Sequence, residues 1–169
     1  MSNVHRHAIA IVCFTCAIAF LNNISKAQSV SEMPQPKTFW ISSGNTFGGY
    51  CIQWNGKKLV YQRFNGNKSV QRRSVSPRPE QWLGFWRDVE RIGVWQWKKS
   101  YKFDERSGTI SDPPQWKLHI IHGERELDSE GEGAFPKDKS FQAFEGLAAK
   151  LLAIKNVYTG TTDTGQHQR

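Results

Sequence analysis

The chain of 169 residues contains little cysteine, and this limits how its fold can be stabilised. Its three cysteines are Cys13, Cys16 and Cys51, and the first two lie in an apolar N-terminal run that we expect to be removed. A single remaining cysteine cannot form an internal disulfide, so we expect a packed core to hold the mature fold. Cys51 lies between apolar neighbours, which favours a buried and inert thiol over intermolecular pairing or a nucleophile.

The sequence also lacks an apolar run of membrane-spanning length at its N-terminus. The run over residues 8–21 has 14 residues, short of the ~20 that a spanning helix needs. Arg6 precedes this run, and the small residues Ser25 and Ala27 follow it, which is the pattern of a secretory signal. We therefore predict a signal peptide over residues 1–27, cleavage before Gln28, and export to the periplasm or the medium. An uncleaved membrane anchor is the alternative.

Acidic residues are absent from Pro34 to Pro79, in a chain whose formal net charge is +8. Basic residues alternate there with aromatic ones, and such a stretch attracts anions. We predict that it binds an anionic polysaccharide, a membrane surface or a protein. Nucleic acid is less favoured, because we expect export and because the aromatic spacing suits a sheet core. The candidate binding residues are Lys57, Lys58, Arg63, Lys68, Arg72, Arg73 and Arg78, with the rings of Trp40 and Trp54.

Carboxylates occupy every second position of one stretch near the C-terminus. In an extended segment they would line one face and could collect Ca²⁺. The stretch lacks the ordered aspartates and glycines of a calcium loop, so we favour a solvent-facing edge that prevents unwanted strand pairing. We predict no metal site and no other cofactor. The residues are Glu124, Glu126, Asp128, Glu130 and Glu132.

Motifs of common catalytic sites are missing from the sequence. It contains no glycine-rich phosphate loop followed by Lys-Ser/Thr, no G-x-S-x-G and no H-E-x-x-H. We therefore predict a non-enzymatic binding domain. One alternative is a small periplasmic hydrolase that uses Cys51 with His119 or His122, and another is a purely structural envelope protein. The two histidines face opposite ways on a predicted strand, so joint metal ligation would require a bulge.

Residues 76–103 carry the strongest local signal for structure. Apolar side chains recur there at spacings of three and four, which predicts a helix that Pro77 and Pro79 begin and Gly93 caps. From Trp95 to Phe103 aromatic residues alternate with polar ones, which predicts a strand. The apolar face of the helix comprises Trp82, Phe85, Trp86, Val89 and Ile92.

The remaining pattern predicts strands over 38–42, 50–54, 59–64 and 116–122 and a helix over 140–155. Asn55-Gly56 predicts a type I′ hairpin. Residues 65–79 read as a basic loop, and residues 123–136 form an acidic, glycine-bearing stretch that is not counted among the predicted strands. The order β-β-β-α-β-β-α predicts an α+β fold: an antiparallel sheet of about five strands with two helices on one face, in a two-layer sandwich. We expect a mobile lead-in over 28–37, one domain over 38–158 and a disordered tail over 159–169.

The C-terminal part contains a short turn motif. Ser129, Gly131, Ala134 and Pro136 match a Ser-x-Gly-x-Asn-Ala-Tyr-Pro pattern, while Gly133 and Phe135 stand where the pattern has Asn and Tyr. With the strand before it and the helix after it, this stretch resembles the C-terminal part of small uncharacterised exported bacterial proteins. The resemblance covers about a quarter of the chain. It implies export and this type of fold, and it implies no activity or site residue.

Overall fold

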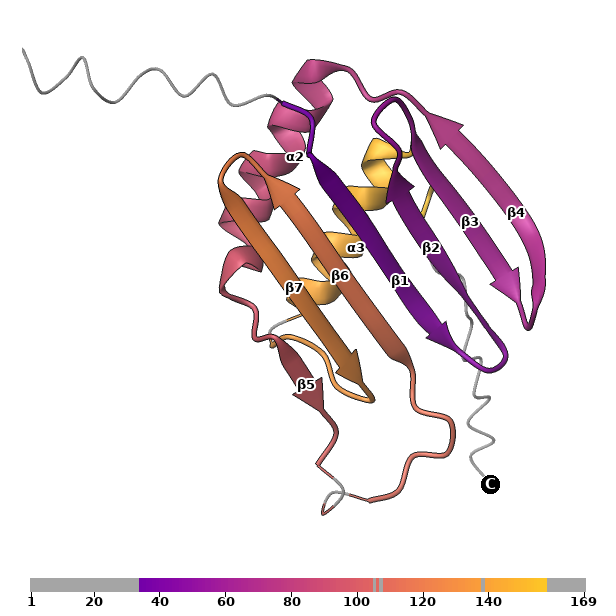
Figure 1. Cartoon of the computed structure of the whole chain (residues 1–169). Coiled ribbons are helices and arrows are strands. Elements are labelled where there is room, and N and C mark those ends of the chain that lie inside the picture. The colour runs from indigo at the N-terminus through magenta and orange to yellow at the C-terminus, as the bar shows by residue number, and fades with distance from the viewer. Residues whose placement is uncertain (1–33, 105, 107, 138, 158–169) are drawn as a thin grey trace, which may run out of the picture. The chain divides into compact units, whose positions relative to one another are not determined.

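The structure, a computed structural model, describes residues 34–104, 106, 108–137 and 139–157. It is an α+β fold with one seven-stranded sheet and two helices, and Figure 1 shows both helices on the same face of the sheet. The strand order is β4-β3-β2-β1-β6-β7-β5. The predicted signal peptide and the predicted C-terminal tail lie outside the described residues.

The first four strands form an antiparallel meander: β1 (Thr38–Asn45), β2 (Gly48–Trp54), β3 (Leu59–Asn65) and β4 (Lys68–Val75). The hairpin between β2 and β3 is confirmed, but its turn is not type I′, since Gly56 has a positive φ (86°) and Asn55 does not. Asn55 Oδ1 instead accepts hydrogen bonds from the backbone amides of Lys57 (3.0 Å) and Lys58 (2.8 Å). The turn therefore spans four residues and presents two lysines.

Strand β4 corrects the prediction of a loop over 65–79. Seven of its eight residues are exposed, so it has no buried face and hence no apolar alternation. Its extended conformation comes from pairing with β3, in which Tyr61 lies opposite Arg73 and Gln62 lies opposite Arg72. This pairing is not visible in the local sequence of β4.

Helix α2 (Pro79–Arg91) confirms the predicted amphipathic helix. Pro79 begins it, the N–H of Arg78 donates to Gln81 Oε1 (2.9 Å), and Gly93 follows its end with φ 70°. Because the Pro79 nitrogen carries no hydrogen and Gly93 tolerates positive φ, both residues suit their positions.

The strand predicted over 95–103 is wrong. The chain forms a 3₁₀ turn, η1 (Val94–Gln96), and then only the short strand β5 (Ser100–Lys102). The aromatic alternation has another origin: Trp95 stacks on Trp86 of α2, while Trp97 packs edge-on against Trp116. Strand β5 pairs parallel to β7, so the sheet is mixed instead of antiparallel.

Strands β6 (Gln115–His122) and β7 (Arg125–Glu132) form the next hairpin, and helix α3 (Ser140–Leu151) closes the fold. β6 and α3 confirm their predictions. β7 lies in the stretch over 123–136, which was not counted among the predicted strands. Its buried positions include Ser129 and Gly131 and therefore show no apolar alternation. With β4 and β7 the sheet has seven strands instead of five.

The core lies between the helices and the sheet and is rich in tryptophan. Five of the seven tryptophans are buried. The Trp82 ring stacks parallel to Trp86 (5.8 Å, 12°) and meets Trp54 edge-on (5.5 Å).

Among the described residues, no helix is both long enough and apolar enough to cross a membrane.

The turn motif, which begins within β7 and continues past its end, holds Trp116 of β6 in place. Trp116 Nε1 donates to the carbonyl oxygen of Ala134 (2.8 Å), and the ring stacks over Phe135 (6.3 Å, 14°). A side chain at Gly131 would collide with the Trp116 indole, and Ser129 Oγ donates to the Lys98 carbonyl oxygen (2.6 Å). The motif therefore has a structural explanation, namely the seating of one buried indole.

Candidate functional site: the basic edge of the sheet

The most exposed strand of the sheet is β4, an edge strand that pairs with β3 alone among the described strands. In Figure 1 it lies at the side of the sheet that extends past both helices. Its basic residues are Lys68, Arg72 and Arg73, and the adjoining β2–β3 turn adds Lys57 and Lys58. We call these five residues the basic edge.

The arginines of the basic edge point to opposite faces of the sheet. Arg73 pairs with Tyr61, which is buried on the helix side, and so Arg73 lies on that side. Arg72 pairs with Gln62 and lies on the open side, which no described helix covers. Successive residues of a strand alternate between faces, so a partner along β4 meets one guanidinium on each side.

The lysines occupy the two ends of the same edge. Lys57 and Lys58 lie at the end where β4 leads into α2, since Leu59 pairs with Val75. Lys68 begins β4 at the other end, next to the β3–β4 turn, where the Gly66 N–H donates a hydrogen bond to the carbonyl oxygen of Phe47 (2.7 Å). The basic edge therefore carries positive charge along its whole length.

These charges have no carboxylate to neutralise them in the described part of the chain. The ion pairs there involve Arg91, Arg106, Lys117, His119 and Arg125 and include no residue of the basic edge. Exposed charges of one sign attract a partner of the opposite sign, and salt screens this attraction over about 10 Å at 0.1 M. The basic edge therefore presents a positive potential that added salt weakens.

Two of the predicted basic residues lie beside the basic edge. Arg63 is on β3 opposite Gln71, on the helix side of the sheet, and is only partly exposed. Arg78 is exposed directly before α2, at the end of the sheet that holds the β2–β3 turn.

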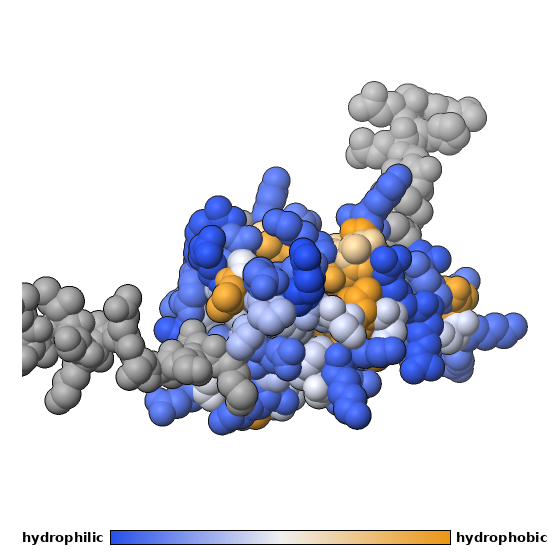
Figure 2. All heavy atoms as spheres, turned by 90° about the horizontal axis from the view of Figure 1, so that it is seen from above, coloured by the Kyte–Doolittle hydropathy of each residue, from blue (hydrophilic) through white to orange (hydrophobic). Residues whose placement is uncertain are grey.

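Seen from above, most of the surface is hydrophilic and its hydrophobic patches are small and separate (Figure 2).

The two candidate tryptophans do not belong to this surface. Trp54 corrects the prediction of an exposed ring, because it is only 7% exposed and packs against Trp82. It shares the helix-facing side of β2 with Tyr50 and Ile52, which fixes its direction. Trp40 is partly exposed on the open face, but β2 and β3 separate its strand from β4, roughly 14 Å at the usual strand spacing.

The residues of the hydrolase alternative lie apart. His122 is buried on the helix side, stacked on Trp86 at 4.1 Å, whereas Cys51 is on the open side. His119 shares the open side, but β1 lies between it and Cys51, and its Nδ1 is 4.0 Å from Asp128. Burial raises the pKa of the Cys51 thiol, which opposes thiolate formation. This arrangement offers no activated nucleophile among the three residues.

The acidic row occupies the open face at the other side of the sheet. Glu126, Asp128 and Glu130 alternate along β7, and Glu130 forms an ion pair with Lys117 of β6 (3.1 Å). β7 is not an edge strand at Glu130, where β5 pairs with it. In the part of the chain that the structure describes, no cluster of three or more His, Cys, Asp or Glu residues could hold a metal ion.

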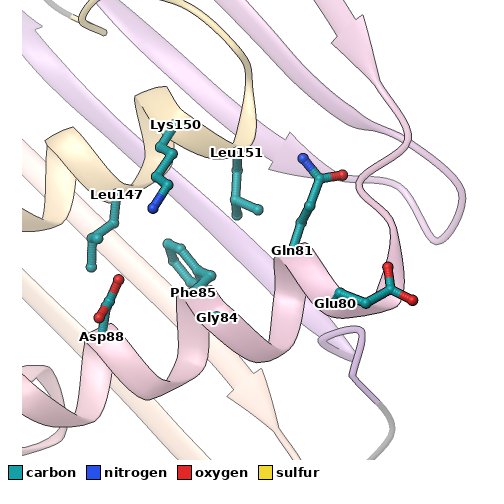
Figure 3. A pocket seen from close by; sticks show the side chains of 8 residues that line it. All are labelled: Glu80, Gln81, Gly84, Phe85, Asp88, Leu147, Lys150 and Leu151. Carbon is teal, nitrogen blue, oxygen red and sulfur yellow. The ribbon is translucent and has the colours of Figure 1, made fainter.

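A shallow groove of about 220 Å³ runs between α2 and α3 (Figure 3). Phe85 of α2 and Leu147 and Leu151 of α3 give it an apolar lining, while Asp88 and Lys150 contribute charges from facing helices. Sites for small molecules usually enclose ~300–1,000 Å³ and gather several polar groups. The groove is therefore smaller than a usual small-molecule site.

The sequence revealed the charges of the basic edge but not their arrangement. Its composition located the basic stretch, whereas the loop prediction missed that Arg72 and Arg73 lie on a strand with a free edge. The stretch KSVQRRSV has neither a regular alternation nor a buried face, so its sequence carries no clear strand signal.

Comparisons of the chain with protein-family models, with curated proteins and with solved structures found no match in any of the three.

Proposed function

We propose that this chain is an exported, non-enzymatic binding domain that recognises an anionic partner through the basic edge. One observation carries the proposal: β4 is exposed on both faces and presents Lys68, Arg72 and Arg73, none of which has an ion-pair partner among the described residues. Export rests on the sequence pattern over residues 1–27.

The chemistry of the edge suits a partner with several negative charges. Arginine binds carboxylate, sulfate or phosphate through paired N–H donors, and lysine adds a mobile point charge. Single surface ion pairs are worth only ~0–1 kcal/mol, so useful affinity requires several contacts at once. The length of β4 and its flanking turn allows this, because five basic residues lie along one edge.

Thermal melting of the purified protein tests the proposal, with the sulfated polysaccharide heparin as the anionic probe. Binding to the folded state alone raises the melting temperature. We expect heparin to raise it at low salt and to lose this effect at high salt. Separate samples contain Ca²⁺ or Zn²⁺ in place of heparin.

The other results contradict the proposal in distinguishable ways. A shift with metal but none with heparin would direct attention to the acidic row or to the histidines. No shift with any probe would favour a structural role. A shift with heparin that persists in high salt would show binding that does not depend on the charges of the basic edge.

A further inference from the structure

We propose that the segment Gln71–Val75 of β4 binds an extended acidic peptide of a partner protein by adding it to the sheet as an eighth strand. This inference rests on the proposed function and specifies the partner as a polypeptide with neighbouring carboxylates. It joins two properties of one strand, its free hydrogen-bonding edge and its two arginines.

The free edge supplies backbone donors and acceptors. A strand with one neighbour pairs only half of its N–H and C=O groups within the sheet, and the other half point outward. In the part of the chain that the structure describes, β4 pairs with β3 alone, and seven of its eight residues are exposed. An added strand would satisfy these groups by the same ladder that joins β3 to β4.

The regular part of the edge has a defined length. Arg63 pairs with Gln71 but Phe64 pairs with Ser69, so Val70 is an extra residue that forms a bulge. At the other end the chain leaves the sheet after Val75 and enters α2 at Pro79. The regular stretch is therefore five residues long, about 17 Å at strand rise, and fits a short extended peptide.

The charges of this stretch select the peptide. Arg72 and Arg73 lie on opposite faces, so a strand beside β4 brings two successive side chains near them, one on each face. Carboxylates at those two positions form cross-strand pairs of opposite charge, which stabilise a sheet by roughly 0.2–1 kcal/mol each. The preferred occupant therefore carries two adjacent acidic residues.

The same charges act against a second copy of this chain. Pairing β4 with the β4 of another copy would bring arginines beside arginines, and like charges in cross-strand positions destabilise a sheet. A polysaccharide has no regular row of amide N–H groups for the outward carbonyl groups, so it would use the charges alone. An acidic polypeptide is favoured because it can both hydrogen-bond to the backbone of β4 and pair its carboxylates with the arginines.

The first test uses two synthetic peptides and the purified protein. One is acetyl-Val-Thr-Glu-Glu-Thr-Val-amide, and the control has the same sequence with every backbone amide N-methylated. The control keeps both carboxylates and loses all backbone donors. We expect the control to bind at least tenfold more weakly. We also expect the unmodified peptide to slow hydrogen exchange of amides in Gln71–Val75.

A charge exchange tests the selectivity. The double variant R72E/R73E should prefer the peptide in which two lysines replace the two glutamates, whereas R87E/K99E, altered at exposed residues outside β4, should keep the original preference. Circular dichroism verifies that both variants remain folded. Because all four residues are exposed, we expect no loss of structure.

The failure of this inference can be separated from the failure of the proposed function. If heparin still stabilises the protein but both peptides bind equally, or β4 amides gain no protection, strand addition is overturned and anion binding stands. If neither heparin nor the acidic peptide binds, both proposals fall.

Discussion

Tyr50 of β2 donates a hydrogen bond to Glu145 of α3 across the interface between the helix and the sheet, with 2.6 Å between Oη and Oε1. The contact is partly buried. Burial is the main cause that raises the pKa of Glu145, and the hydrogen bond from Tyr50 only partly opposes it. Burial, with the charge of Glu145, also raises the pKa of Tyr50, so its hydroxyl remains a donor at neutral pH.

This relationship predicts the effect of E145Q on stability. The raised pKa of folded Glu145 means that its protonated form stabilises the fold. That contribution is present below the pKa of the unfolded carboxyl group and is lost as pH rises through the folded pKa. The free energy of unfolding of E145Q, relative to the parent, should therefore increase between pH 4 and pH 7. Urea unfolding across this range measures it, and a decrease would contradict the assignment.

Removal of the donor predicts a loss of stability. Y50F leaves a partly buried carboxyl group without its tyrosine donor, which should cost about 1–3 kcal/mol of unfolding free energy at pH 7. In the E145Q background the same change should cost less, since no charge remains to be stabilised. Equal costs in the two backgrounds, measured as a double-mutant cycle, would show that the two residues are not coupled.

We expect alanine at Gly131 to disturb the packing, whereas alanine at Gly146 should not. A Cβ at Gly131 would collide with the Trp116 indole and the Ala134 carbonyl oxygen, so G131A should lower the unfolding free energy by about 1–3 kcal/mol. Gly146 lies inside α3 with no atom within 4 Å of the corresponding Cβ. G146A should therefore raise stability by about 0.5–1 kcal/mol, as alanine does in helices. Thermal unfolding of both variants compares them, and a similar loss in both would refute the seating of Trp116.

We expect the thiol of Cys51 to react slowly with alkylating reagents. Burial raises the pKa of the thiol, and a hydrogen bond with Trp40 only partly lowers it. Its alkylation by iodoacetamide should therefore be slower at pH 8 than that of glutathione, and its rate should still rise above pH 9. A rate that reaches its plateau below pH 7 would reveal an activated thiolate and would favour the hydrolase alternative.

The amphipathic elements were predictable because the spacing of apolar residues along the local sequence indicates which side chains are buried. Trp82, Phe85, Trp86 and Val89 recur at helical spacing and are buried, as expected for α2. The strands β4 and β7 could not be predicted in this way. β4 buries nothing, and β7 buries serine and glycine beside the large Trp116 ring, so both depend on neighbours distant in sequence.

The candidate site was likewise predictable only in part. The basic composition predicted which residues carry charge, but the free edge that arranges Arg72 and Arg73 arises from the strand order. Trp54 was predicted as a possible exposed ring although it alternates in phase with Tyr50 and Ile52, and that phase directs it into the core. Similarly, Trp95 and Trp97 show an alternation that a 3₁₀ turn produces without a strand.

The most direct measurement of the central claim is the affinity for heparin at several salt concentrations, for the parent and two charge-matched variants. K68Q/R72Q/R73Q removes three charges from β4, and R87Q/K99Q/K155Q removes three from exposed positions elsewhere. We predict that the first variant loses at least tenfold in affinity and shows a shallower salt dependence, while the second changes little, because only contacting cations release counterions on binding. Equal losses in the two variants would show that net charge alone attracts the polyanion, and the basic edge would then not be the binding site.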